Sequence, residues 1–235
     1  MASFFDPVTA VALVPAIAKG LGTTMLMVVP AITGGSMLGF AIALVRVRAT
    51  PILDKLAKAY ISVFRGTPLL VQLFLAYFAV PGLLYAMGID VRRADPIWFA
   101  IATLGLNQAA FLSEVFRSAI AAVDEGQIEA GRALGLKEWQ VGWLVVLPQA
   151  ALLALPGWGN ALVILFQETS LAFTIGVMEV MGSAHASGVR SYQSLEAYAA
   201  AALIFIAISL TLEAVFSLLA RRLGAPGGTS PVVGS

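Results

Sequence analysis

The sequence contains no cysteine and only one histidine, His185. This excludes thiol nucleophiles and disulfides, and it removes the usual cysteine and histidine sets that hold zinc. Charge is also scarce, because Asp, Glu, Lys and Arg make up 11% of the chain, whereas a soluble domain carries about 25%. The net charge of +1 offers no basic face of the kind that binds nucleic acid. We therefore expect no metal site, no catalytic residues and no nucleic-acid partner.

Apolar residues dominate instead. They account for 60% of the chain, and the mean hydropathy is +0.91. A chain with so few charged residues cannot cover a surface that faces water. Most of the protein surface must therefore face lipid. Five uncharged runs have about the length that crosses a bilayer core: residues 20–45, 66–89, 96–113, 142–167 and 197–212, the last continuing to about 220. The sequence predicts an all-α, polytopic membrane protein with five transmembrane helices.

The lysines and arginines fall unevenly between these runs. Ten lie in the connections after the first and third runs and in the tail: Arg46, Arg48, Lys55, Lys58, Arg65, Arg117, Arg132, Lys137, Arg221 and Arg222. The remaining four are Lys19, Arg92, Arg93 and Arg190. Because basic residues favour the cytoplasmic side, we expect the N-terminus outside and the C-terminus inside.

Three regions follow from these patterns. Residues 1–19 hold a short apolar stretch interrupted by Pro15, which we interpret as an interfacial segment, with a disordered tail as the alternative. Residues 20–222 form one transmembrane domain without an evident internal repeat. Residues 223–235, rich in proline and glycine, are expected to be disordered.

The connection between the third and fourth runs is too polar for the membrane but has apolar positions at helical spacing. Gly126 and Gly135 bracket it, and Gly135 suits the left-handed position just past a helix end. We expect a short helix near residues 126–136 on the cytoplasmic face, joined to two spans. A partner that grips it would move both spans; a plain connector is the alternative.

A family resemblance is carried by residues 129–136, Glu-Ala-Gly-Arg-Ala-Leu-Gly-Leu, and by residues 146–149, Val-Leu-Pro-Gln. Together they resemble the EAA signature of membrane subunits of binding-protein-dependent ABC importers. Residues 64–74, 114–117 with 125–127, and 169–171 with 175–177 resemble the polar-amino-acid branch of that family. The resemblance covers about residues 20–220. Three positions depart from the usual pattern: Gly131 replaces alanine, Gln167-Glu168 replaces Lys-Asp, and Lys137 replaces a capping serine.

The resemblance implies a type I importer-like pore subunit in a bacterial cytoplasmic (inner) membrane. It would carry a polar amino acid such as glutamine, histidine, arginine or cystine. Its partners would be ABC ATPase subunits, a second permease subunit, identical or similar, and an extracytoplasmic substrate-binding protein. The short helix would couple to the ATPase through Glu129, Ala130, Gly131, Arg132 and Gly135. The chain has no phosphate-binding loop, so ATP and Mg²⁺ belong to the partner and no cofactor is expected on this chain.

Several polar residues lie within or at the ends of the apolar runs. Such groups usually face the bundle interior or a cavity, and they often mark a substrate path. As pathway candidates we take Gln72, Asn107, Glu114, Glu168, Thr169 and Ser170. The two carboxylates would accept hydrogen bonds from a substrate ammonium. Hydrogen bonding or salt bridges between helices are the alternative for each of them.

Two rival functions remain open at this stage. A stand-alone secondary transporter driven by an ion gradient is the first, although many such proteins carry an internal inverted repeat. A polytopic membrane enzyme is the second, and no nucleophile–base pair or HExxH pattern supports it. The sequence favours a transport subunit over an enzyme.

Overall fold

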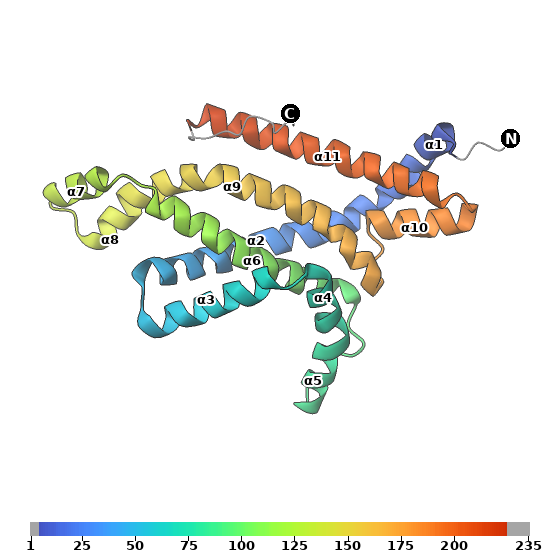
Figure 1. Ribbon diagram of the computed structural model, residues 1–235, viewed down its shortest axis with the longest axis horizontal. Helices are drawn as coiled ribbons and strands as arrows, with labels where there is room; N and C mark the ends of the chain where they lie inside the picture. Colours follow the sequence, from blue (N-terminus) through green and yellow to red (C-terminus); the bar gives the residue numbers. More distant parts are fainter. Residues whose placement is uncertain (1–4, 225–235) are drawn as a thin grey trace.

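The computed structural model describes residues 5–224, and every regular element within them is a helix (Figure 1). The elements, with η1 and η4 as 3₁₀ turns and η2 and η3 as π-helical turns, are α1 Pro7–Ile17, η1 Ala18–Gly20, α2 Leu21–Arg48, α3 Pro51–Gly66, α4 Leu69–Phe74, η2 Leu75–Ala79, α5 Val80–Ala86, α6 Pro96–Ala121, α7 Glu125–Ala133, α8 Glu138–Gln140, η3 Val141–Val146, α9 Leu147–Glu168, η4 Thr169–Ile175, α10 Val180–Ser191 and α11 Ser194–Arg222.

Five helical segments are long and apolar enough to cross a membrane: Pro7–Arg48, Leu69–Ala86, Pro96–Ala121, Glu138–Ile175 and Ser194–Arg222. They confirm the five spans predicted from the uncharged runs. The first segment is longer than expected, because the backbone stays helical through η1 and joins α1 to α2. The interfacial position of residues 1–19 stays a prediction, although residues 7–17 are helical. Most of the predicted disordered tail, residues 225–235, lies outside the described residues.

Prolines and acidic caps explain where several helices begin. Pro96 occupies the first turn of α6, where its missing N–H costs nothing, and the Asp95 carboxylate accepts a hydrogen bond from the N–H of Ile97 at 2.9 Å. Asp6 and Pro7 start α1 in the same way. These local signals fix the ends of the elements, while lipid and packing stabilise their middles.

The core of the bundle is formed by α2, α6 and α9, with α11, α10 and α1 packed along one side (Figure 1). Gly35 and Gly39 let α2 approach α6 closely. A Cβ at Gly35 would lie 3.0 Å from the carbonyl oxygen of Gly105, and one at Gly39 would lie 3.0 Å from that of Ala109. The small residues spaced four apart therefore serve the close helix contact that such spacing favours.

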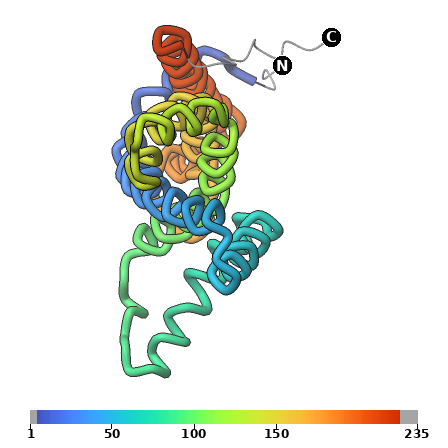
Figure 2. The backbone as a smooth tube through the Cα atoms, turned by 90° about the vertical axis from the view of Figure 1, so that its left-hand side faces the viewer, coloured from blue at the N-terminus to red at the C-terminus, as the bar shows by residue number. Residues whose placement is uncertain are grey.

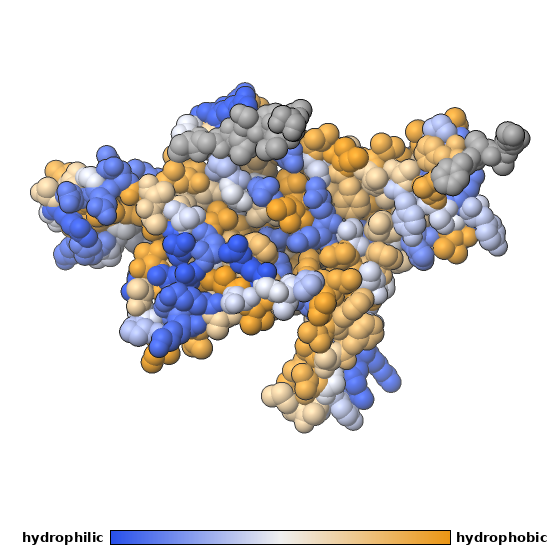
Figure 3. Space-filling view, in the orientation of Figure 1, coloured by the Kyte–Doolittle hydropathy of each residue, from blue (hydrophilic) through white to orange (hydrophobic). Residues whose placement is uncertain are grey.

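The segment α4–η2–α5 projects away from this bundle (Figures 1 and 2). Its surface is mostly apolar in the hydropathy view, with Phe78, Leu83 and Met87 each more than 60% exposed (Figure 3). An apolar surface of this size needs lipid or another protein against it. The projection is therefore suited to the apolar interior of a membrane.

Helix ends that carry predicted cytoplasmic residues gather in one half of the molecule. The α2–α3 turn, α7 and the C-terminal end of α11 lie in that half, whereas α1, α10 and the start of α11 lie in the other (Figure 1). This arrangement fits a protein with two chemically distinct ends. Which end faces the cytoplasm stays a prediction.

Candidate functional site

A polar cavity of about 350 Å³ opens beside α6 and α9, near the C-terminal end of α3. Four charged residues line it, namely Arg65, Glu114, Arg117 and Glu168, together with the amides of Gln108 and Asn160. Ionisable groups on membrane-spanning helices are costly and usually line cavities or pathways. The volume also lies in the usual range for small-molecule sites. This cavity is the candidate binding site of the chain.

Glu114 is held by two arginines. One carboxylate oxygen accepts a hydrogen bond from Nη1 of Arg46 on α2, and the other accepts one from Nε of Arg117 at 3.0 Å. Arg46 Nε also lies 3.5 Å from a carboxylate oxygen of Asp54, which pairs with Lys58 at 2.7 Å. The hydrogen bond from Lys58, helped by the charge of Arg46, lowers the pKa of Asp54. Glu114 thus lines the cavity, but its oxygens already have partners within the chain, and its place in a substrate pathway stays a prediction.

Glu168 has a weaker set of contacts. Its carboxylate accepts one long hydrogen bond, 3.4 Å from Nε2 of Gln108. Gln108 is 2% exposed, and its Oε1 has no hydrogen-bond partner among residues 5–224. A buried amide oxygen without a partner is rare in proteins and calls for an explanation. Glu168 itself lines the cavity and, with this one long hydrogen bond, keeps acceptor positions for a donor bound there.

Gln72 and Asn107 meet each other outside the cavity lining. The Nδ2 of Asn107 donates to Oε1 of Gln72 at 3.1 Å, and Nε2 of Gln72 donates to the carbonyl of Phe64 at 2.9 Å and to that of Thr67 at 3.0 Å. These bonds join the free carbonyls at the end of α3 to α4 and α6. The geometry matches the alternative left open for both residues, hydrogen bonding between helices.

Thr169 and Ser170 bond back to their own chain. The Thr169 hydroxyl donates to the carbonyl of Phe166 at 2.6 Å, and the Ser170 hydroxyl donates to that of Gln167 at 2.7 Å. Thr169 is fully buried, and neither residue lines the polar cavity. Of the six predicted pathway residues, the structure brings Glu114 and Glu168 together in one cavity and places the other four elsewhere.

The cavity also contains residues that sequence reasoning did not assign to it. Arg65 lies over the ring of Phe111, with 5.1 Å between its Cζ and the ring centre. Gln108 and Asn160 stood out only as polar groups in apolar runs. A sequence signal exists for α6, because residues 108, 111, 115 and 118 recur at helical spacing and share a face. Arg65 has no such signal, since only the path of α3 brings it there.

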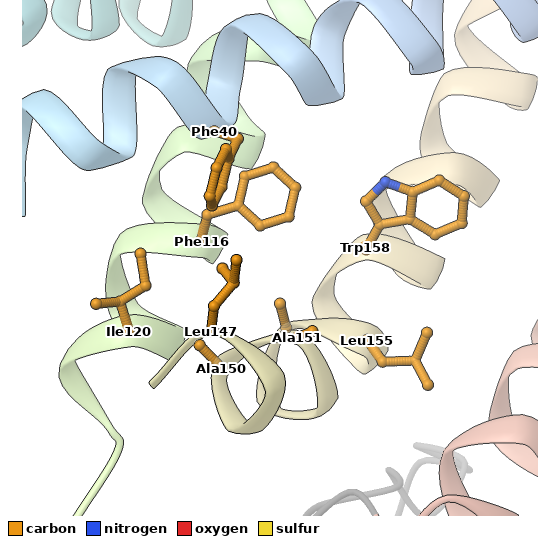
Figure 4. A pocket seen from close by; sticks show the side chains of 9 residues that line it. Phe40, Phe116, Ile120, Leu147, Ala150, Ala151, Leu155 and Trp158 are labelled. Atoms are coloured by element: carbon orange, nitrogen blue, oxygen red, sulfur yellow. The ribbon is translucent and has the colours of Figure 1, made fainter. Parts of the chain in front are cut away.

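A second cavity, of about 190 Å³, lies between α2, α6 and α9 and is apolar (Figure 4). The rings of Phe40 and Phe116 meet edge to face at 5.9 Å, and the indole N–H of Trp158 donates to the hydroxyl of Ser36 at 2.8 Å. Among residues 5–224, no ionisable side chain lines it. It lacks the groups needed to bind a charged or zwitterionic molecule.

The predicted lever is α7, which begins at Glu125 and ends at Ala133 (Figure 1). Gly135 follows in the left-handed region, with φ +79°. The N–H of Leu136 donates to the carbonyl of Gly131 and that of Gly135 to Arg132, which is the Schellman pattern of a helix end. The left-handed glycine predicted from the sequence is therefore present.

The predicted coupling residues differ in what they offer a partner. Glu129, Ala130, Arg132 and Gly135 are exposed. Gly131 is buried instead, and a Cβ there would lie 3.4 Å from Val141 and 3.5 Å from Val145 of the same chain. Gly131 therefore packs inside the chain, with room for a methyl group at ordinary contact distance, and its role in coupling stays a prediction. No group of three or more Asp, Glu or His residues placed to hold a metal occurs within residues 5–224.

Residues 35–225 match the family described as the inner membrane component of binding-protein-dependent transport systems. The chain belongs to this family. It is 38% identical to the L-cystine transport system permease protein of Bacillus subtilis, over 89% of this chain and 88% of that one. It is 32% identical to the glutamine transport system permease protein of Escherichia coli, over 89% and 94%. A crystal structure of an amino acid ABC transporter with histidines matches at 32% identity with a TM-score of 0.82, covering 93% of this chain and 99% of that one.

Family membership settles several expectations. The permease is an integral membrane transport subunit and not an enzyme, and the stand-alone secondary transporter loses its support. The five-helix, all-α architecture agrees with the match to the solved transporter. As a component of a binding-protein-dependent system, the permease works with other subunits.

Proposed function

We propose that this permease forms half of the pore of an ATP-driven amino-acid importer in a bacterial inner membrane. The observation that carries the proposal is the cavity beside α6 and α9, which carboxylates and guanidinium groups line together. A zwitterionic amino acid needs acceptors for its ammonium group and donors for its carboxylate, and the cavity offers both. The relatives named for cystine and glutamine transport support the substrate class.

The energy in this proposal comes from a separate ABC ATPase that holds α7. Glu129, Ala130, Arg132 and Gly135 form the exposed contact surface, and Gly131 supports it from within. ATP and Mg²⁺ stay on that partner. A second permease subunit packs in the membrane, and an external binding protein delivers the substrate.

Replacing Glu168 with Gln tests the cavity. The change keeps the size of the side chain and removes the charge that meets the substrate ammonium, so we expect amino-acid uptake into proteoliposomes to fall at least about tenfold. Glu213→Gln is the matched control, because Glu213 is exposed on α11 and lies outside the cavity. Equal uptake by the two variants and the native permease would contradict this site.

Replacing Gly135 with Leu tests the lever. The substitution strains the left-handed turn, although the space around it is open. We expect substrate-stimulated ATPase activity to be lost while the permease still folds. Gly88→Leu is a matched control, because Gly88 also has a left-handed φ of +89° and open space but lies in the α5–α6 connection. Full coupling in the Gly135 variant would remove α7 from the mechanism.

Single cysteines test the orientation, since the native chain has none. Ala133 on α7 and Ser191 on α10 are both exposed and belong to opposite halves of the molecule (Figure 1). A membrane-impermeant maleimide should label Ser191→Cys in intact cells and Ala133→Cys only after lysis. The reverse pattern would invert the proposed topology.

A further inference from the structure

We propose that the polar cavity selects amino acids with an uncharged side chain over those with a cationic or an anionic one. The inference rests on the proposed function and names the substrate class of the same site. Some charged side chains of the cavity form ion pairs within the chain, and others do not. The proposed selectivity follows from this difference.

The charged side chains of the cavity divide into paired and unpaired groups. Glu114 and Arg117 neutralise each other at 3.0 Å, and Arg46 occupies the second oxygen of Glu114. Arg65 and Glu168 form no salt bridge within residues 5–224. The cavity therefore presents one free positive and one free negative group. A zwitterion with a neutral side chain can place its ammonium at the negative group and its carboxylate at the positive one, so that no charge of the substrate stays unpaired.

The second step is hydrogen bonding at the negative group. Because the Gln108 amide donates to Glu168, its Oε1 is left as an acceptor, buried and without a partner. An ammonium group has three donors and no acceptor. Glu168 accepts one long hydrogen bond among residues 5–224, so its carboxylate keeps acceptor positions for those donors. The α-ammonium of a substrate would thus bind at Glu168, which lines the cavity.

The third step concerns the positive group. Arg65 lies on the face of Phe111, which holds a planar guanidinium without using its hydrogen-bond donors. A carboxylate pairs well with that group, since guanidinium and carboxylate can form two parallel hydrogen bonds. The α-carboxylate of the substrate would bind there.

A second charge on the substrate finds no free partner. A cationic side chain meets the guanidinium groups of Arg65 and Arg117, while the oxygens of Glu114 are already occupied. An anionic side chain meets Glu114 and Glu168 in the same way. Like charges repel, so both classes should bind more weakly.

The test measures binding to the purified permease–ATPase complex in nanodiscs, without the binding protein, which would impose its own selectivity. Labelled L-glutamine is displaced by L-arginine or L-glutamate. We expect both competitors to bind at least about tenfold more weakly than L-glutamine. Arg65→Gln should shift the preference toward L-arginine, and Glu168→Gln should shift it toward L-glutamate.

Two further variants control the result. Arg93→Gln removes an arginine from the α5–α6 connection and should change nothing. Arg65→Lys keeps the charge and should keep the preference for L-glutamine, even if Arg65→Gln fails to assemble. Equal or tighter binding of L-arginine by the native complex would overturn this inference and leave the proposed function intact. Absence of binding by all three amino acids, with uptake unaffected by Glu168→Gln, would overturn both.

Discussion

The guanidinium of Arg132 and the carboxylate of Glu138 form two parallel hydrogen bonds, Nε to Oε1 at 2.8 Å and Nη2 to Oε2 at 3.1 Å. The pair bridges the glycine turn between α7 and α8. Arg132 was predicted as a contact for the ATPase, but its guanidinium already has a partner in its own chain. We expect this pair to fix the direction of α7 in addition to any contact that Arg132 makes with the ATPase.

A charge swap distinguishes this role from direct contact. Arg132→Glu should reduce substrate-stimulated ATPase activity several-fold, because Glu138 would repel it and free α7 to turn. The double variant with Glu138→Arg should recover most of the activity. Stability should change little in both variants, since exposed ion pairs contribute little to it. If the double variant stays as inactive as the single one, Arg132 acts on the partner directly.

The contact between α2 and α6 gives a second prediction. Leu at Gly35 would meet the Gly105 carbonyl and Gln108, so the helices must separate, at a cost of about 1–3 kcal/mol. Gly34→Leu on the same helix has open space around it and should be tolerated. Thermal denaturation followed by size-exclusion chromatography compares the two. Similar melting temperatures would show that α2 and α6 do not rely on this close approach.

A third prediction separates structure from selectivity at Gln72. Gln72→Ala removes the donor that satisfies the carbonyls of Phe64 and Thr67, so stability should fall by about 1–3 kcal/mol. The ratio of L-glutamine to L-arginine binding should stay unchanged, because Gln72 does not line the cavity. Glu168→Gln should instead change the ratio of L-glutamine to L-arginine binding and leave the stability nearly unchanged. A Gln72 variant of native stability with altered selectivity would return that residue to the pathway.

Composition and periodicity were enough to predict the five spans, because lipid requires long apolar helices whatever their tertiary packing. They also predicted the left-handed turn at Gly135, which depends on local backbone chemistry alone. The site was predicted only in part. Glu114 and Glu168 stood out as charges at the ends of apolar runs, but pairing of Glu114 with Arg46 depends on how α2 packs against α6. Arg65 reaches the same cavity because of how α3 packs in the fold, and no local sequence pattern predicts that packing.

Glu179 provides a pH-dependent prediction. It is fully buried just before α10, where its carboxylate oxygens accept hydrogen bonds from the N–H groups of Met181 and Gly182, both at 2.8 Å. Those bonds favour the charged form, but burial outweighs them and raises the pKa of Glu179 to about 7. At a pH between 4.5 and 7, Glu179 is therefore protonated in the native state and ionised in the unfolded chain.

The sign of the effect follows from proton binding. Below pH 4.5 both states are protonated and Glu179 carries no penalty. Between pH 4.5 and 7 the native state binds more protons than the unfolded one, so the free energy of unfolding falls as pH rises, by on the order of 3 kcal/mol in all. Glu179→Gln removes the ionisation and should be more stable than the native permease at pH 8 but similar to it at pH 5. Melting curves at the two pH values, with Glu213→Gln as an exposed control, measure this difference; an unchanged pH slope in the Glu179 variant would show that Glu179 is not its source.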